Sequence, residues 1–246
     1  NMDNTLILGD CLEKMANIPD GSVDMVLCDL PYGVLNKRNA KAKWDSEVDL
    51  TKLWKNYRRV CKKNAAIVLF GQGMFTAKLM MSNPKMWRYN LIWKKGDRVT
   101  GFLNANRMPL RNHEDVLVFY RQMPVFHPQM VYTGMHKVNH VKGNRHKPTV
   151  NNIYGDFVEL PTRMSEMKYP KSVLNFQPPH TGFHHPTEKP VPLLEWLIRS
   201  YTNEGDTVLD NCMGSGSTGV AAARCGRRFI GIEINEDWYG TAVKRI

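Results

Sequence analysis

The most distinctive chemical motif of the sequence is the tetrapeptide Asp29-Leu30-Pro31-Tyr32, which follows the apolar run Val23–Cys28. An aspartate, a carbonyl held by the following proline and an aromatic ring can all face one planar base. Asp29 and the Leu30 carbonyl can accept hydrogen bonds from an exocyclic amino group and direct its lone pair, while Tyr32 can stack on the ring. This combination suits group transfer to the amine of a base that has been flipped out of its helix.

Residues 209–219 form a second motif, in which Gly214, Gly216 and Gly219 have the spacing G-x-G-x-x-G. Glycines let a ligand approach the backbone closely, and the start of a following helix offers unpaired N–H donors. Glu233, at the end of the next apolar run, has the spacing expected of a carboxylate that binds ribose hydroxyls. The pattern predicts a nucleoside-containing cofactor. NAD is an alternative, but an NAD site would leave residues 29–32 unexplained.

The hydrophobic pattern predicts the elements that position these motifs. Three segments with helical spacing, residues 50–61, 193–201 and 238–246, lie among short β-branched runs, as in a doubly wound α/β sheet with helices on both faces. We expect a mostly parallel sheet of seven strands, at Thr5–Leu8, Val23–Cys28, Ala65–Phe70, Tyr89–Trp93, Asp115–Tyr120, Thr207–Leu209 and Phe229–Ile232.

Four of the expected strands are followed by or end near an acid, namely Asp10, Asp29, Asp210 and Glu233. In an open α/β sheet, ligands bind beyond the carboxyl ends of the strands. A single acid at such a position is commonly a helix cap, and Asp10 could be only that. Four acids together predict a ligand-binding edge.

One region interrupts the alternation of strands and helices. Residues 121–185 carry seven of the fourteen prolines, seven of the eight histidines, and eight Lys/Arg against three Asp/Glu. Because a compact core rarely holds so long an irregular segment without a purpose, we expect a basic inserted lobe here that contacts the partner. Residues 1–120 and 186–246 would then form the catalytic core.

The formal net charge of +11 favours a polyanionic partner, because each phosphate contact by Lys or Arg releases counterions. The five cysteines include no C-x-x-C pair, so we expect buried free thiols. His180, His184 and His185 have no cysteine near them, and no metal is expected. No apolar run has the length of a membrane span and no signal peptide opens the chain, which predicts a cytoplasmic protein.

Three segments resemble motifs of the amino-group DNA methyltransferases. Residues 29–32 resemble their Asp-Pro-Pro-Tyr signature, residues 210–216 their Phe-x-Gly-x-Gly cofactor loop, and residues 185–190 the segment before that loop. The order is that of the β class, which places its target-recognition region between these motifs. Phage and prophage enzymes are especially similar, which implies a prokaryotic or phage-infected cell. The resemblance implies a Rossmann-like, S-adenosylmethionine-dependent methyltransferase fold and methyl transfer to N6 of adenine in double-stranded DNA.

The resemblance also assigns roles to residues. The catalytic motif is matched by Asp29, Leu30, Pro31 and Tyr32. Glu233 matches the acid that binds the ribose, and Asp10 and Cys11 match the segment along the cofactor's adenine. The full set of expected cofactor contacts is Asp10, Cys11, Asp29, Thr187, Lys189, Asp210, Asn211, Cys212, Met213, Gly214, Ser215, Gly216, Ser217, Thr218, Glu233 and Ile234.

Two departures from the family's pattern bear on these roles. Leu30 replaces the usual first proline but keeps the carbonyl. Residues 211–213, Asn-Cys-Met, replace the usual aromatic-containing run and leave open what packs beside the sulfonium.

Three other functions are alternatives to this one. Methylation of cytosine at C5 requires a Pro-Cys nucleophile, and no proline here precedes a cysteine. Methylation of cytosine at N4 uses the same geometry and stays open, although that type more often begins the tetrapeptide with Ser, so Asp29 favours adenine. A catalytically silent DNA-binding protein on the same scaffold is an alternative of a different class, but it would not need both motifs.

Basic and polar residues outside the two motifs are candidates for DNA contacts. These are Lys37, Arg38, Lys41, Lys43, Asn106, Arg107, Lys142 and Arg145. The resemblance adds two further expectations, that the chain forms a homodimer and that a cognate restriction endonuclease accompanies it.

Overall fold

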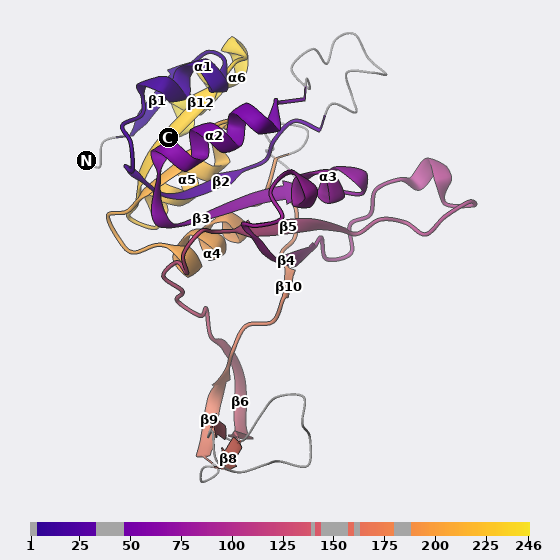
Figure 1. Ribbon diagram of the computed structural model, residues 1–246. Helices are drawn as coiled ribbons and strands as arrows, with labels where there is room; N and C mark the ends of the chain where they lie inside the picture. The colour runs from indigo at the N-terminus through magenta and orange to yellow at the C-terminus, as the bar shows by residue number, and fades with distance from the viewer. Residues whose placement is uncertain (1–3, 33–46, 139–140, 144–156, 160–162, 180–187) are drawn as a thin grey trace. The chain divides into compact units, whose positions relative to one another are not determined.

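The computed structural model describes residues 4–32, 47–138, 141–143, 157–159, 163–179 and 188–246. The chain divides into two units, one made of residues 1–127 and 172–246 and the other of Pro128–Lys171. The strands and helices of the first unit alternate along the chain and form a three-layered α/β arrangement (Figure 1).

The first unit is built on one sheet of eight strands. In spatial order they are β1 (Thr5–Leu8), β12 (Arg228–Glu233), β11 (Thr207–Asp210), β2 (Val23–Cys28), β3 (Cys61–Gly71), β5 (His113–Phe119), β4 (Trp87–Lys94) and β10 (Val173–Asn175). All neighbours pair in parallel except β5, which is antiparallel to both β3 and β4. The predicted count of seven strands is therefore wrong by one. The additional strand is the three-residue β10, which lies inside the proline-rich region and pairs with β4.

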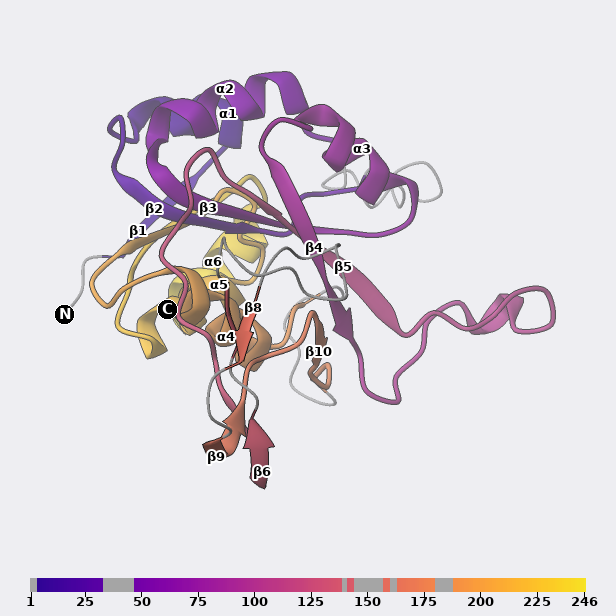
Figure 2. The same cartoon turned by 60° about the horizontal axis from the view of Figure 1, so that its bottom comes forward.

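Helices cover both faces of this sheet, as Figure 2 shows from a second direction. One face carries α1 (Cys11–Lys14), the short 3-10 helix η1 (Met15–Asn17), α2 (Leu50–Val60) and α3 (Met74–Ser82). The other face carries α4 (Val191–Tyr201), α5 (Ser217–Arg224) and α6 (Glu236–Arg245). A further 3-10 helix, η2 (Phe102–Asn104), lies between β4 and β5. None of the helices in the described ranges is long and apolar enough to cross a membrane.

Strand β2 shows why the sheet is buried from both sides. Val26 and Cys28 belong to the core under α2, while Met25 and Leu27 belong to the core over α4 and α5. A parallel strand covered on both faces is apolar along its whole length, and each large side chain so buried contributes about 1.5–3 kcal/mol. The strand is thereby fixed, and Asp29 is placed at the point where it leaves the core.

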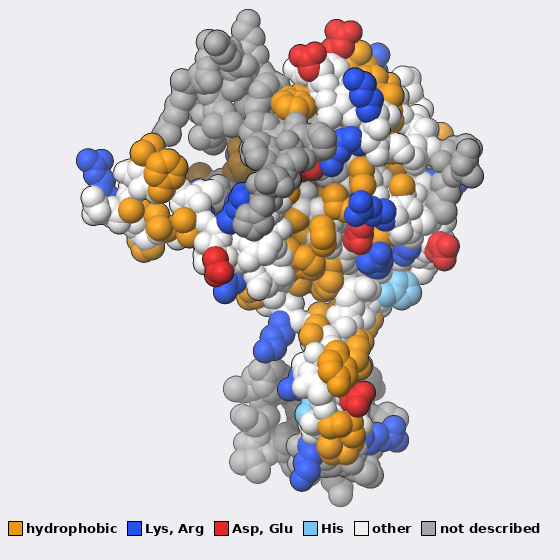
Figure 3. All heavy atoms as spheres, turned by 180° about the vertical axis from the view of Figure 1, so that it is seen from behind, with side chains coloured by type: hydrophobic (Ala, Val, Ile, Leu, Met, Phe, Trp, Pro, Cys, Tyr) orange, Lys and Arg blue, Asp and Glu red, His pale blue; other side chains and the backbone are white. Residues whose placement is uncertain are grey.

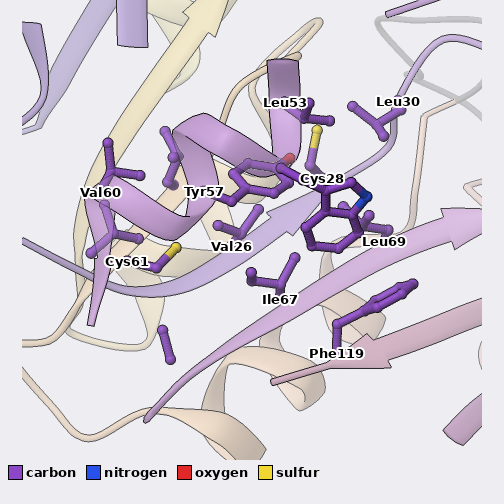
Figure 4. Close-up of a cluster of buried hydrophobic side chains, with 14 of the residues drawn as sticks. Val26, Cys28, Leu30, Leu53, Tyr57, Val60, Cys61, Ile67, Leu69 and Phe119 are labelled. Carbon is purple, nitrogen blue, oxygen red and sulfur yellow. The ribbon is translucent and has the colours of Figure 1, made fainter. Parts of the chain in front are cut away.

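Helix α2 follows from its sequence. Asp49 accepts hydrogen bonds from the amides of Thr51 and Lys52, which caps the first turn. Leu53, Tyr57 and Val60 recur at helical spacing and are fully buried, and Figure 4 shows them over the β2 and β3 side chains. The predicted stripe extended to Cys61, but that residue already begins β3.

The second unit contains two short antiparallel pairs. Strand β6 (Val131–Val138) pairs with β9 (Arg163–Lys168), and β7 (Val141–Gly143) pairs with β8 (Phe157–Glu159). This unit is shorter than the predicted lobe at 121–185, because the residues on either side of it pack in the first unit. His127, for example, pairs its Nε2 with the Asn203 side-chain oxygen at 2.8 Å.

Candidate active site

The four predicted acids follow or end four adjacent parallel strands. Because β1, β12, β11 and β2 are consecutive in the sheet and run in the same direction, Asp10, Glu233, Asp210 and Asp29 all lie at its carboxyl edge. The Gly9 amide donates to the Glu233 carbonyl at 2.8 Å, which joins the end of β1 to the end of the adjacent β12. The expectation of a shared edge, made from the sequence, is met by this topology.

Asp10 and Glu233 are held by backbone amides. Asp10 Oδ1 accepts from the Leu12 amide at 2.8 Å, so it does cap α1. Glu233 Oε2 accepts from the Gly214 amide and Oε1 from the Asn235 amide, both at 2.8 Å. The Glu233 bonds tie the end of β12 to the glycine loop. Each carboxylate oxygen still has acceptor capacity for a hydroxyl or amino group of a ligand.

The glycine loop runs from Asp210 at the end of β11 into α5. Gly216 has a φ of +85°, which favours glycine, and it begins the turn into the helix. A Cβ on Gly219 would lie 2.7 Å from the Phe229 ring, so this glycine allows close packing of helix on strand. Because α5 follows the end of β11, its first turn lies at the carboxyl edge of the sheet, as expected of a cofactor loop.

Asp210 is almost fully buried, and its oxygen accepts from the Cys212 amide at 3.1 Å. Burial raises the pKa of its carboxyl to about 7. The Tyr57 hydroxyl donates to the Asn211 side-chain oxygen at 2.6 Å and fixes the next residue of the loop from α2. All five cysteines are free, four of them buried, which confirms the predicted free thiols.

Two loop serines are joined to side chains that the sequence did not indicate. Arg245, in the last turn of α6, donates to the Ser215 carbonyl at 2.9 Å. It also pairs with Glu188 at 2.7 Å, and Glu188 accepts from the Ser217 hydroxyl at 2.8 Å. The segment that precedes α4 is thus bound to the glycine loop through Glu188.

Asp29 lies in a chain of alternating buried charges. Its Oδ2 is 2.5 Å from Lys189 Nζ, which in turn is 3.2 Å from Glu114 Oε2. Glu114 Oε1 is 2.5 Å from Lys95 Nζ. The side chains of Lys189, Glu114 and Lys95 are only 8 to 11% exposed, so these interactions are weakly screened by water.

Burial and neighbouring charges act in opposite directions on these groups. Burial raises the pKa of the Asp29 carboxyl above its ordinary value, although Lys189 lies beside it. Burial also disfavours the charged form of Glu114, but the two lysines next to it hold its pKa below the ordinary value. The pKa of Lys189 is raised by Asp29 and Glu114 in spite of burial, which keeps its ammonium charged. Asp29, with one lysine, is therefore the more easily protonated of the two acids.

Tyr32 is fixed on one side. Its hydroxyl donates to Asp29 Oδ1 at 3.2 Å, and its ring packs against Phe75 of α3 with centroids 4.6 Å apart. A cavity of about 350 Å³ lies at the start of α3 and of β5 and is lined by Thr76, Glu114 and Asp115, among others. The cavity meets the Asp29 charge chain at Glu114, and its volume can accept part of a ligand.

The structure brings together most of the residues that the sequence singled out. Those at the carboxyl edge are Asp10, Cys11, Asp29 to Tyr32, Lys189, Asp210 to Thr218, Glu233 and Ile234. The ammonium of Lys189, which was expected beside the cofactor, binds Asp29 and Glu114. Asn106 and Arg107 are exposed between β4 and β5. Thr187, Lys37, Arg38, Lys41, Lys43, Arg145, His180, His184 and His185 lie outside the described residues, as does the side chain of Lys142.

The sequence did not point to Glu114, Lys95, Phe75, Glu188 or Arg245. Glu114 had one available signal, because it is an acid at the start of an apolar run. The start of a strand lies at the carboxyl edge only when that strand is antiparallel to its neighbours, as β5 is.

Known proteins similar to this chain include DNA methyltransferases. A family model described as DNA methylase, of the N6/N4 type, matches residues 23–244. The Type II methyltransferase M.HinfI of Haemophilus influenzae is 27% identical over 264 residues, covering 99% of this chain and 68% of that protein.

Solved structures agree in fold. The M1.HpyAVI–SAM complex has a TM-score of 0.66 at 23% identity and covers 99% of this chain and 98% of that one. The cytosine-N4-specific PvuII DNA methyltransferase has a TM-score of 0.68 at 16% identity and covers 100% of this chain and 87% of that one. The predicted Rossmann-like methyltransferase fold is confirmed.

Proposed function

The chain belongs to the N6/N4 family of DNA methylases, and from this premise we propose that it transfers a methyl group from S-adenosylmethionine to N6 of adenine in double-stranded DNA. The observation that carries the proposal is the position of Asp29. Its carboxylate lies at the same sheet edge as Glu233 and the glycine loop, so an amine held by Asp29 would face a cofactor held by Glu233.

The carboxyl edge fits S-adenosylmethionine. Glu233 has acceptor capacity for ribose hydroxyls, Asp10 and Cys11 follow the neighbouring strand β1 at the start of α1, and the glycine loop at residues 214–217 lies at the same edge. When bound, the cofactor supplies a methyl carbon made electrophilic by its sulfonium and leaves as S-adenosylhomocysteine. The side chains of Asp10 and Glu233 are anionic acceptors, which suits a cofactor with positive charge.

Asp29 and the Leu30 carbonyl would orient the amine. Both accept hydrogen bonds from an amino group, which directs the nitrogen lone pair away from the ring and toward the methyl carbon. As the N–C bond forms, the nitrogen releases one proton. Asp29 is a suitable first acceptor, because burial raises the pKa of its carboxyl. Lys189 holds the carboxylate in place at 2.5 Å, and Tyr32, backed by Phe75, offers a ring for stacking.

Adenine is favoured over cytosine by the acid at the first position of the tetrapeptide. N4 of cytosine is the second candidate, since one structure with the same fold is cytosine-N4-specific. The amines of adenine and cytosine need the same hydrogen-bond acceptors. The two bases differ in the size of the ring system and in the polar groups beside the amine.

The polyanionic partner follows from the net charge of +11. We assign target recognition to the inserted region 121–185, which contains the unit Pro128–Lys171, and phosphate contacts to Lys37, Arg38, Lys41 and Lys43. A homodimer and a restriction partner stay predictions from the resemblance.

One experiment tests the proposal. Purified protein is incubated with labelled S-adenosylmethionine and unmethylated bacterial DNA, which is then digested to nucleosides for mass spectrometry. We expect N6-methyladenine, and we expect Asp29→Ala to abolish it while S-adenosylmethionine binding, measured by calorimetry, is kept. N4-methylcytosine would overturn the choice of base. Cofactor binding without any methylated nucleoside would support a silent DNA-binding protein instead.

A further inference from the structure

Residues 95–112, here called the β4–β5 arm, form an ordered projection. The Lys95 amide donates to the Asn112 carbonyl at 2.8 Å, and Thr100 and Arg111 exchange backbone hydrogen bonds of 2.7 and 3.1 Å. Helix η2, Phe102–Asn104, lies at the far end. In Figures 1 and 2 the arm extends away from the sheet, so its conformation rests on its own backbone bonds.

The end of the arm is apolar and exposed. Phe102 is 71% exposed, Leu103 85% and Met108 55%. Exposure of large apolar side chains is unfavourable by about 25 cal/mol for each Å², and adjacent exposed residues of this kind mark interaction sites. Within the described part of the chain, nothing covers them. The arm therefore presents an apolar surface to a partner.

The charge around that surface selects the kind of partner. Residues 94–113 contain five Lys/Arg and one Asp, and Arg107 and Arg111 are both exposed. Figure 3 shows hydrophobic and basic side chains together on the projecting segment. An apolar end between cations is complementary to nucleic acid, where cations contact phosphates and apolar wedges enter between base pairs.

The base of the arm is joined to the transfer site. Strand β4 runs parallel to β3 and β2, and β5 runs opposite to them, so the arm leaves and re-enters the sheet at the edge that carries Asp29. Lys95, the first residue of the arm, pairs with Glu114, and Glu114 is linked through Lys189 to Asp29. The arm therefore projects from the edge at which a flipped base would be received.

We propose that Phe102 and Leu103 enter duplex DNA beside the target base pair and keep it unstacked while the base is outside the helix. The inference rests on the proposed function, which requires a base to leave the duplex. Unstacking one step is unfavourable by a few kcal/mol, and an inserted apolar side chain offsets part of this by replacing the lost stacking. Arg107 and Arg111 contact the flanking phosphates.

The test uses the full chain and the recognition site mapped by sequencing DNA that the wild type has methylated. Two duplexes carry this site, one fully paired and one with an abasic site opposite the target base, which lowers the barrier to flipping. Single-turnover methylation is measured for wild type, for F102A/L103A and for the control M81A/M123A. Met81 and Met123 are 74% and 78% exposed at the opposite edge of the sheet.

We expect F102A/L103A to lower the rate on the paired duplex by about tenfold or more and on the abasic duplex by less than about threefold. The control should match wild type on both. Equal losses on the two duplexes, or no loss, would overturn the proposal. So would a wild-type dimer that F102A/L103A converts to monomers in light scattering, since the occupant would then be a second copy. If the wild type methylates no DNA, so that no recognition site can be mapped, the proposed function is refuted instead.

Discussion

The carboxylates of Asp10, Glu233 and Asp210, at the ends of β1, β12 and β11, accept hydrogen bonds from backbone amides. Asp29, which follows the neighbouring β2, is held instead by Lys189, 160 positions later in the chain. The amide donors are neutral, and all but the Gly214 amide belong to the loop that follows the acid itself. The lysine is a buried cation that two carboxylates share. The carboxylates of the cofactor half of the edge are therefore held mainly by backbone amides, while the substrate half, at Asp29, depends on the side chain of a distant lysine.

The difference has an energetic consequence. A carboxylate that loses a backbone donor can still be solvated or accept from another amide. Removal of one member of a buried ion pair leaves an uncompensated charge, at a cost of about 3–5 kcal/mol. The substrate half should accordingly be the more sensitive to single substitutions, and the following predictions test this.

The largest effect is expected at Lys189. Lys189→Met leaves Asp29 and Glu114 without their shared cation, and we expect a loss of about 3–5 kcal/mol in the free energy of unfolding, measured with urea. The double variant D29N/K189M removes the Asp29 pair as a unit and leaves Glu114 with Lys95, so it should lose less than K189M alone. If the loss in the double variant equals the sum of the losses in D29N and K189M, Asp29 and Lys189 are not coupled.

Asp210 shows the effect of burial on a carboxyl group that, unlike Asp29, has no lysine beside it among the described residues. Its pKa is raised from 3.8 to about 7, so the folded state binds the proton more tightly than the unfolded state. The stability from the protonated form is fully present below pH 3.8 and is lost as the pH rises through about 7. At about 1.4 kcal/mol for each pH unit, this loss reaches up to about 4 kcal/mol.

Asp210→Asn removes that titration and keeps an acceptor for the Cys212 amide. Between pH 5 and pH 8 the variant should therefore lose less stability than the wild type, as measured by urea unfolding at each pH. Parallel pH curves for the two proteins would contradict the raised pKa.

Glu233 tests the cofactor half. Glu233→Ala removes an ionised acceptor, and hydrogen bonds to charged groups contribute about 1.5–3 kcal/mol, so S-adenosylmethionine should bind about tenfold to a hundredfold more weakly in calorimetry. Glu236→Ala, an exposed acid three residues later in α6, is the matched control and should bind normally. Unchanged affinity in E233A would remove the ribose role.

The smallest effect is expected at Asp10. Asp10 caps α1 and Asp49 caps α2 in the same manner, each accepting from two amides. Replacement of either by Ala should lower stability by about 1 kcal/mol in thermal unfolding. Only Asp10→Ala should also weaken S-adenosylmethionine binding. Equal cofactor affinity in the two variants would leave Asp10 as a helix cap and nothing more.

Much of the fold was predictable because its elements are determined by local pattern. Thr5–Leu8 and Val23–Cys28 were predicted at their observed bounds. The three residues of β10 carry no periodicity that can be recognised, so the eighth strand was missed. Its existence depends on pairing with β4.

The sequence by itself determined the acids at the strand ends, the glycine loop and the tetrapeptide at residues 29–32, since each is a short pattern whose geometry follows from its own backbone. Only the tertiary structure decided that Lys189 serves Asp29 and Glu114, that Lys95 completes the chain of charges, and that the β4–β5 arm leaves from the same edge. Those contacts join residues that are distant in the chain. They form because the antiparallel β5 brings the start of a strand to an edge made otherwise of strand ends.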